Sequence, residues 1–101
     1  MATITDHGRQ RIKDRIGLRK KQSNSIAEKA LQHGICHYES KGRLKKYFDK
    51  LFLSHRTANN IRIYHEKVFI FKDDVLITVM DLPNDLKRSA LSISKNKQKK
   101  I

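Results

Sequence analysis

The sequence has little of what several familiar protein classes need. Cys36 is the only cysteine, so the chain forms no internal disulfide and builds no cysteine-rich zinc module. A single cysteine is typical of a reducing, intracellular setting. No apolar stretch is long enough for a signal peptide or a membrane span. We therefore expect a cytoplasmic protein with no membrane partner.

Acidic residues are scarce as well. Ten Asp and Glu stand against 23 Lys and Arg, and the formal net charge is +13. Such an excess causes self-repulsion in a compact chain and favours an anionic partner. With 101 residues the chain has the size of one small domain, which excludes a two-domain enzyme with a separate cofactor module. The four glycines are scattered and form no phosphate-cradling loop, and we expect no cofactor.

The first expected helix is short and basic. Asp6 is a suitable N-cap, the helix runs through Ile16, and Gly17 ends it. At 100° per residue Ile12 points inward together with Ile16. The cations then fall into two rows: His7, Arg11 and Arg15 on one side of the apolar stripe, and Arg9 and Lys13 on the other.

Two more amphipathic helices are expected before the strands. The first has apolar or small residues three and four apart from Ser23 to Leu31 and ends at His33, before Gly34. The second is predicted by the spacing of Leu44, Tyr47, Phe48, Leu51 and Phe52.

The period then changes to that of strands. Three short runs rich in Ile, Val, Phe and Tyr, separated by two-residue turns, predict a β-meander: Asn60–Tyr64, Lys67–Lys72 and Val75–Met80. In the last run both faces are mostly apolar, so this strand is central or covered on both sides, with Thr78 as its polar residue. The fold class we expect is α+β, with two or three N-terminal helices packed on a three- or four-stranded antiparallel meander.

Pro83 stops the sheet, which gives a single domain over residues 1–88. Residues 89–101 are rich in Ser, Lys and Gln and contain no acid. We expect this segment to be a basic, disordered tail.

The basic charge favours nucleic acid as the partner. Seven cations lie between Arg9 and Lys21, with Asp14 as the only acid among them. A solvated helix face is the plainer alternative for such a run. The residues we expect to bind nucleic acid are Arg9, Lys13, Arg15, Arg19, Lys20, Lys21, Arg56, Arg62 and, by stacking on a base, Tyr64.

The sequence also contains the side chains that RNA cleavage without a metal requires. That reaction needs a group to accept the 2′-OH proton, a group to protonate the leaving oxygen, and cations beside the phosphorane. His7 and His55 are candidate acids or bases, Tyr64 and Thr78 are candidate donors, and the candidate phosphate clamps are Arg11, Arg15, Arg56 and Arg62. Five histidines and 23 cations in a small chain also converge by chance.

A family resemblance points in the same direction. Residues 5–15 (TDHGRQRIKDR) resemble the T-x-H-[AG]-x-x-R-hydrophobic-x-x-R opening helix of small RelE-like domains, and residues 75–79 (VLITV) resemble their closing strand. These domains belong to the barnase–EndoU–colicin–RelE ribonuclease fold group, which includes many toxins and mobile-element proteins. The resemblance implies helices followed by an antiparallel sheet, and it implies an active cleft lined by His7, Arg11 and Thr78.

A metal site is not expected. His33, Cys36 and His37 put three ligand types within five residues, whereas a structural zinc normally needs four, and His55 and His65 lie far away in sequence.

Two functions remain open at this stage. The first is nucleic-acid binding, to RNA rather than DNA, joined to metal-independent endoribonuclease activity of the toxin type. The second is a non-catalytic phage or mobile-element protein that inhibits or binds a nucleic-acid-processing complex through its basic surface. An acidic protein, either an antitoxin or a nucleic-acid-processing enzyme, is a further candidate partner.

Overall fold

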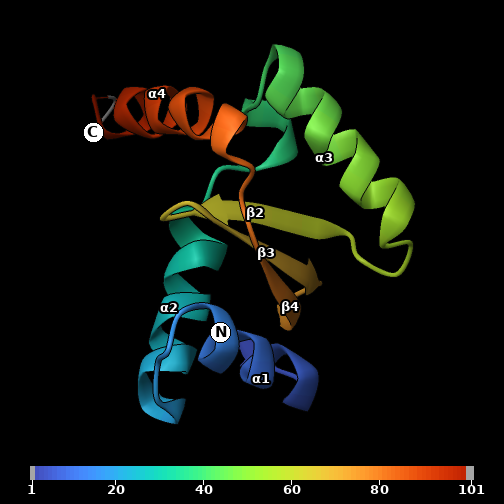
Figure 1. The fold of residues 1–101 in the computed structure, drawn as a ribbon, viewed down its shortest axis with the longest axis vertical. Helices are drawn as coiled ribbons and strands as arrows, with labels where there is room; N and C mark the ends of the chain where they lie inside the picture. Colours follow the sequence, from blue (N-terminus) through green and yellow to red (C-terminus); the bar gives the residue numbers. More distant parts are fainter. Residues whose placement is uncertain (1, 100–101) are drawn as a thin grey trace.

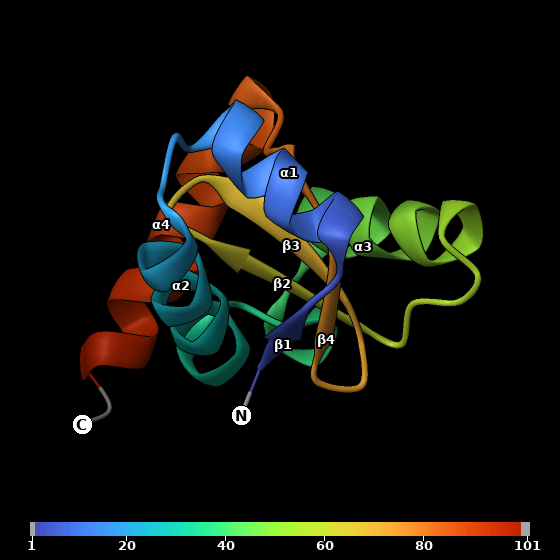
Figure 2. The same ribbon diagram turned by 90° about the horizontal axis from the view of Figure 1, so that it is seen from below.

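The computed structural model describes residues 2–99 and has three layers. A four-stranded sheet forms the middle layer, with α1 and α2 on one side and α3 and α4 on the other (Figures 1 and 2). The expected α+β class is confirmed.

The helices that precede the meander lie where the periodicity predicts them. They are α1 (Asp6–Arg15), α2 (Lys20–His33) and α3 (Gly42–Ser54), with a short 3₁₀ turn η1 (His37–Glu39) before α3. The cap of α1 is Thr5 rather than Asp6, because the Thr5 hydroxyl accepts the Gly8 N–H at 3.0 Å. Gly17 ends the helix as expected, at a φ of +79° that glycine adopts without strain.

The sheet contains the expected meander and one strand more. Its strands are β1 (Thr3–Ile4), β2 (Asn60–Tyr64), β3 (Lys67–Lys72) and β4 (Val75–Asp81), in the order β1-β4-β3-β2. β2, β3 and β4 are antiparallel, whereas β1 pairs parallel with the start of β4, at Val75 and Leu76. The sheet is therefore mixed and not purely antiparallel. A two-residue strand has no periodicity from which it could be predicted.

Each face of the sheet has its own core. On the side of α3 and α4, Leu44, Phe48 and Leu51 pack on alternate residues of β2 and β3, including Ile61 and Ile70. On the side of α1 and α2, a smaller cluster joins Ile12, Ala27 and Ala30 to Phe69, Phe71, Leu76 and Val79. Because β4 lies between β1 and β3 with helices on both faces, the expectation of a covered strand is confirmed.

The expectation of disorder from residue 89 onward is wrong for the part that the structure describes. After the 3₁₀ turn η2 (Asn84–Leu86), the chain continues as helix α4 (Lys87–Lys99). Leu86, Ala90 and Ile93, spaced by four and three residues, pack on the core beneath α3. This apolar stripe holds α4 on the sheet despite its basic composition. No helix among residues 2–99 is both long and apolar enough to cross a membrane.

Candidate nucleic-acid interface

Helix α1 is held close to the sheet by its first turn. The Thr5 hydroxyl donates to the carbonyl oxygen of Leu76 at 3.1 Å. A Cβ atom on Gly8 would lie 2.8 Å from that same oxygen, so only glycine allows this close approach. Ile12 is fully buried one turn later. Position and rotation of α1 are thereby fixed, and so are the directions of its cations.

The first row of α1 side chains contains the pair that the sequence predicts. Arg11 Nε lies 3.5 Å from His7 Nε2, so the imidazole and the guanidinium share one face of α1. The His7 side chain is exposed and Arg11 is half-buried. This face can therefore bring one cation and one proton-transfer group to a phosphate.

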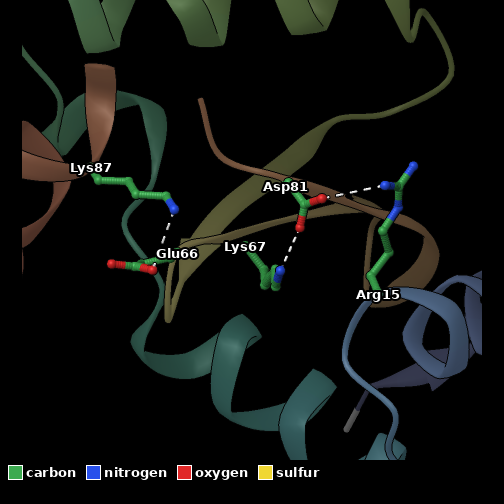
Figure 3. A network of polar contacts seen from close by, with 5 residues as sticks. All are labelled: Arg15, Glu66, Lys67, Asp81 and Lys87. Carbon is green, nitrogen blue, oxygen red and sulfur yellow. Dashed lines mark hydrogen bonds and ion pairs between the residues drawn. The ribbon is translucent and has the colours of Figure 1, made fainter. Parts of the chain in front are cut away.

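Arg15, the third member of this row, is engaged in an ion pair. Its Nη1 lies 3.3 Å from Asp81 Oδ2, at the end of β4. The other carboxylate oxygen of Asp81 contacts Lys67 Nζ, and Glu66 pairs nearby with Lys87 at 3.6 Å (Figure 3). The hydrogen bond from Lys67, with the charges of Lys67 and Arg15, lowers the pKa of Asp81. Arg15 thus joins α1 to the sheet, a role that no pattern in the sequence indicates.

Thr78 does not join His7 and Arg11. It pairs with Ile70, and directly opposed residues of adjacent strands project from the same face of a sheet. Ile70 belongs to the core beneath α3, whereas α1 packs through Ile12 on the other face. The Thr78 side chain is itself buried, with 8% exposure. The proposed cluster of His7, Arg11 and Thr78 is therefore not assembled, because the sheet separates its members.

The second row of α1 side chains faces the start of α2. Arg9 Nη2 lies 3.5 Å from Asn24 Oδ1 of α2. Lys13, Arg19 and Lys21 are exposed, and within residues 2–99 none of them forms an ion pair. The side chain of Lys20 lies outside the described part of the structure. Arg9, Lys13, Arg19 and Lys21 form a cationic edge between α1 and α2, and all four are among the residues that the sequence predicts as nucleic-acid contacts.

The remaining nucleic-acid candidates are placed less favourably. Arg62 is half-buried and donates to the carbonyl oxygen of Gly34 at 3.1 Å and to Asn60 Oδ1 at 2.9 Å, so it tethers β2 to the end of α2. Tyr64 is half-buried against the α1–α2 core, and its ring makes an edge-to-face contact with the ring of His65. Arg56 is exposed but follows α3, on the other helical layer. These three residues do not extend the cationic edge between α1 and α2.

The residues weighed as metal ligands have partners within the protein. Glu39 accepts hydrogen bonds from both the backbone N–H and the thiol of Cys36. Burial, together with this hydrogen bond, raises the pKa of the Cys36 thiol. The His37 ring contacts Asp49 Oδ1 at 2.7 Å. Among the described residues, no three His, Cys, Asp or Glu side chains are grouped closely enough to hold a metal ion.

Comparison of the chain with protein-family models, with curated proteins and with solved structures gives no match.

Proposed function

We propose that this protein binds nucleic acid, RNA in preference to DNA, through a cationic surface made by α1 and the start of α2. This surface, the α1–α2 surface, consists of Arg9, Lys13, Arg19 and Lys21 at the junction of the two helices, and of Arg11 on the other side of α1. It flanks the exposed side of α1, where Gln10 and Asp14 are joined by a hydrogen bond. Single-stranded nucleic acid binds to cationic surfaces mainly through its phosphates.

The observation that carries this proposal is the grouping of Arg9, Lys13 and Arg19 around one cavity between α1 and α2, with no ion pair to any of them within the described chain. Within the described chain, none of the five cations of the α1–α2 surface contacts a carboxylate. Placing like charges side by side destabilises a fold, and an anionic ligand offsets that repulsion. RNA is favoured over DNA by the resemblance of α1 to the opening helix of RelE-like domains.

Binding without cleavage is the form of this function that fits best. Cleavage of RNA needs two proton-transfer groups around one phosphate. Among the described residues of the expected cleft, only one such group, the His7 imidazole, lies beside Arg11. Thr78, the second polar group of the expected cleft, lies on the opposite face of the sheet. Endoribonuclease activity remains the second candidate, favoured by the exposed His7 imidazole beside a guanidinium.

Binding of the full chain to labelled RNA over a range of salt concentrations tests the proposal. Each phosphate contact on a single strand contributes about −0.7 to the slope of log affinity against log salt. Contacts from this surface therefore predict a slope of roughly −2 to −4. If neither single-stranded RNA nor duplex DNA binds even at low salt, the proposal is wrong and the surface serves an acidic protein partner.

Incubation of the protein with mixed RNA in EDTA separates binding from cleavage. We expect intact RNA after incubation under conditions where it is bound. Cleavage that is lost in His7→Ala while RNA affinity is retained would establish the second candidate instead.

A further inference from the structure

A cavity of about 440 Å³ lies between α1, the connection after it and the first turn of α2. Its lining includes Arg9 and Lys13 from α1 and Arg19 at the start of α2, with Leu18 as an apolar wall. The volume lies within the usual range for small-molecule sites. The cavity is large enough for a phosphate group with part of a nucleotide.

The charges around this cavity do not cancel. Three cations and one carboxylate, that of Asp6, line it, which leaves a net charge of +2. The positive end of α2 adds to this potential, since the first turn of α2 contains no acidic residue. A dianion would neutralise the lining.

Arg9 lines both this cavity and the one beside it. Its Nη1 atom is shielded from solvent and has no hydrogen-bond partner among the described residues. Its Nη2 atom makes only a long contact, 3.5 Å, to Asn24. Because Asn24 lines only the neighbouring cavity, the tip of the Arg9 side chain lies at the border between the two.

A neighbouring cavity serves as an internal contrast. It has a volume of about 710 Å³ and shares Arg9, but it is also lined by Glu28. The Glu28 carboxylate accepts the Ala2 N–H, and that hydrogen bond lowers the Glu28 pKa. One cation and one carboxylate leave this second cavity without the excess positive charge of the first.

We propose that the cavity bounded by Arg9, Lys13 and Arg19 binds a phosphomonoester, either the terminal phosphate of an RNA strand or the phosphate of a free nucleotide. A phosphomonoester carries close to two negative charges at pH 7, which matches the lining, whereas each internal phosphodiester carries one. The cavity thus selects a strand end, and the cations outside it contact the internal phosphates. Binding of a strand end rests on the proposed RNA binding, whereas binding of a free nucleotide does not.

The test compares RNAs of one sequence that differ only at their ends. Strands with a 5′-phosphate, a 3′-phosphate or two hydroxyl ends are titrated with the full chain, and adenosine monophosphate is titrated separately. A strand with a terminal phosphate is expected to bind at least about tenfold more tightly than the hydroxyl strand, as the loss of charged hydrogen bonds implies. Tighter binding of adenosine monophosphate than of adenosine, with no preference among strands, supports the site with the free nucleotide as its ligand.

Two double variants assign any preference to the cavity. Lys13→Ala with Arg19→Ala removes two exposed cations from the lining and should reduce the preference for a phosphate to about twofold or less. Lys45→Ala with Lys46→Ala removes the same charge from the exposed face of α3 and should leave the preference unchanged. A preference that survives the first variant overturns the assignment.

The outcomes also separate this inference from the proposed function. Equal and tight binding of all three strands, with no binding of adenosine monophosphate, overturns the phosphomonoester site and leaves RNA binding intact. Failure of every strand and of adenosine monophosphate to bind overturns both.

Discussion

The two faces of the sheet carry basic helices that are built differently. Beneath α3 and α4, large side chains such as Phe48 fill the core, and charged residues of this layer include the pairs Arg43–Asp85 and Lys87–Glu66. Beneath α1 and α2, small residues such as Gly8 and Ala27 bring the helices close to the sheet. On that side the cations at the junction of α1 and α2 line a cavity and form no ion pairs within the described chain. Neither net charge nor unpaired cations alone locate the interface, since Lys45, Lys46 and Lys50 of α3 also form no ion pair within the described chain; the cavity lined by cations lies between α1 and α2.

The largest effect on stability is expected beneath α3. Phe48 is fully buried, and Phe48→Ala should lower the free energy of unfolding by about 3–5 kcal/mol, measured by urea denaturation. The affinity of the remaining folded protein for RNA should stay the same, because Phe48 lies on the face away from the α1–α2 surface. If fully folded Phe48→Ala protein lost RNA affinity, RNA would bind on the side of α3 and α4, which would contradict the account.

A smaller effect of unusual sign is expected at Gly8. Gly→Ala inside a helix normally stabilises a protein by about 1 kcal/mol. Here the new Cβ would lie 2.8 Å from the Leu76 carbonyl oxygen, so Gly8→Ala should destabilise the fold by about 1–3 kcal/mol, measured by urea denaturation. A more stable Gly8→Ala protein would show that α1 lies farther from β4 than described.

Most of the fold could be predicted from the sequence, because local periodicity controls it. The strands of the meander begin and end within one residue of the positions that their apolar spacing predicts, and α2 ends at His33 as predicted. β1 could not be predicted, since two residues carry no period. α4 was missed because its core-facing residues Ala90 and Ile93 lie in a segment whose Ser and Lys content is typical of disorder.

The candidate site could be predicted only within one helix. Helical spacing places His7 beside Arg11, four residues apart. Thr78 lies on the face opposite to Val79, but the sequence does not say which face α1 covers, so the grouping with His7 was wrong. The cavity depends on how α1 and α2 meet, and that is a tertiary feature which neither helix predicts.

Part of the loss of thermal stability at acid pH should come from protonation of Asp81, which joins α1 to the sheet. Its pKa is lower in the folded state than in the unfolded chain, through the hydrogen bond from Lys67 and the charges of Lys67 and Arg15. The stabilising contribution is therefore present above the unfolded pKa, near 4, and is lost as the pH falls further. Asp81→Asn should lower the midpoint of thermal unfolding slightly at pH 7 and leave it unchanged at pH 2. An equal loss at both pH values would contradict this origin.

The smallest effect is expected at Thr78. Because the sheet separates Thr78 from α1, Thr78→Val should change RNA affinity by no more than about twofold in a filter-binding measurement. Arg11→Ala, on the face that we assign to RNA, provides the positive comparison. A large loss of RNA binding or cleavage in Thr78→Val would restore the grouping that the structure separates.

The most direct measurement is the salt dependence of RNA affinity in two charge-matched variants. One carries Arg11→Ala, Lys13→Ala and Arg19→Ala on the α1–α2 surface, and the other carries Lys45→Ala, Lys46→Ala and Lys50→Ala on the exposed side of α3. If the α1–α2 surface holds the phosphates, the first variant loses about 2 from the slope of log affinity against log salt, and the second keeps the slope of the unmodified protein. Equal losses in both variants would show that RNA responds to total charge alone and would contradict the assignment to α1 and α2.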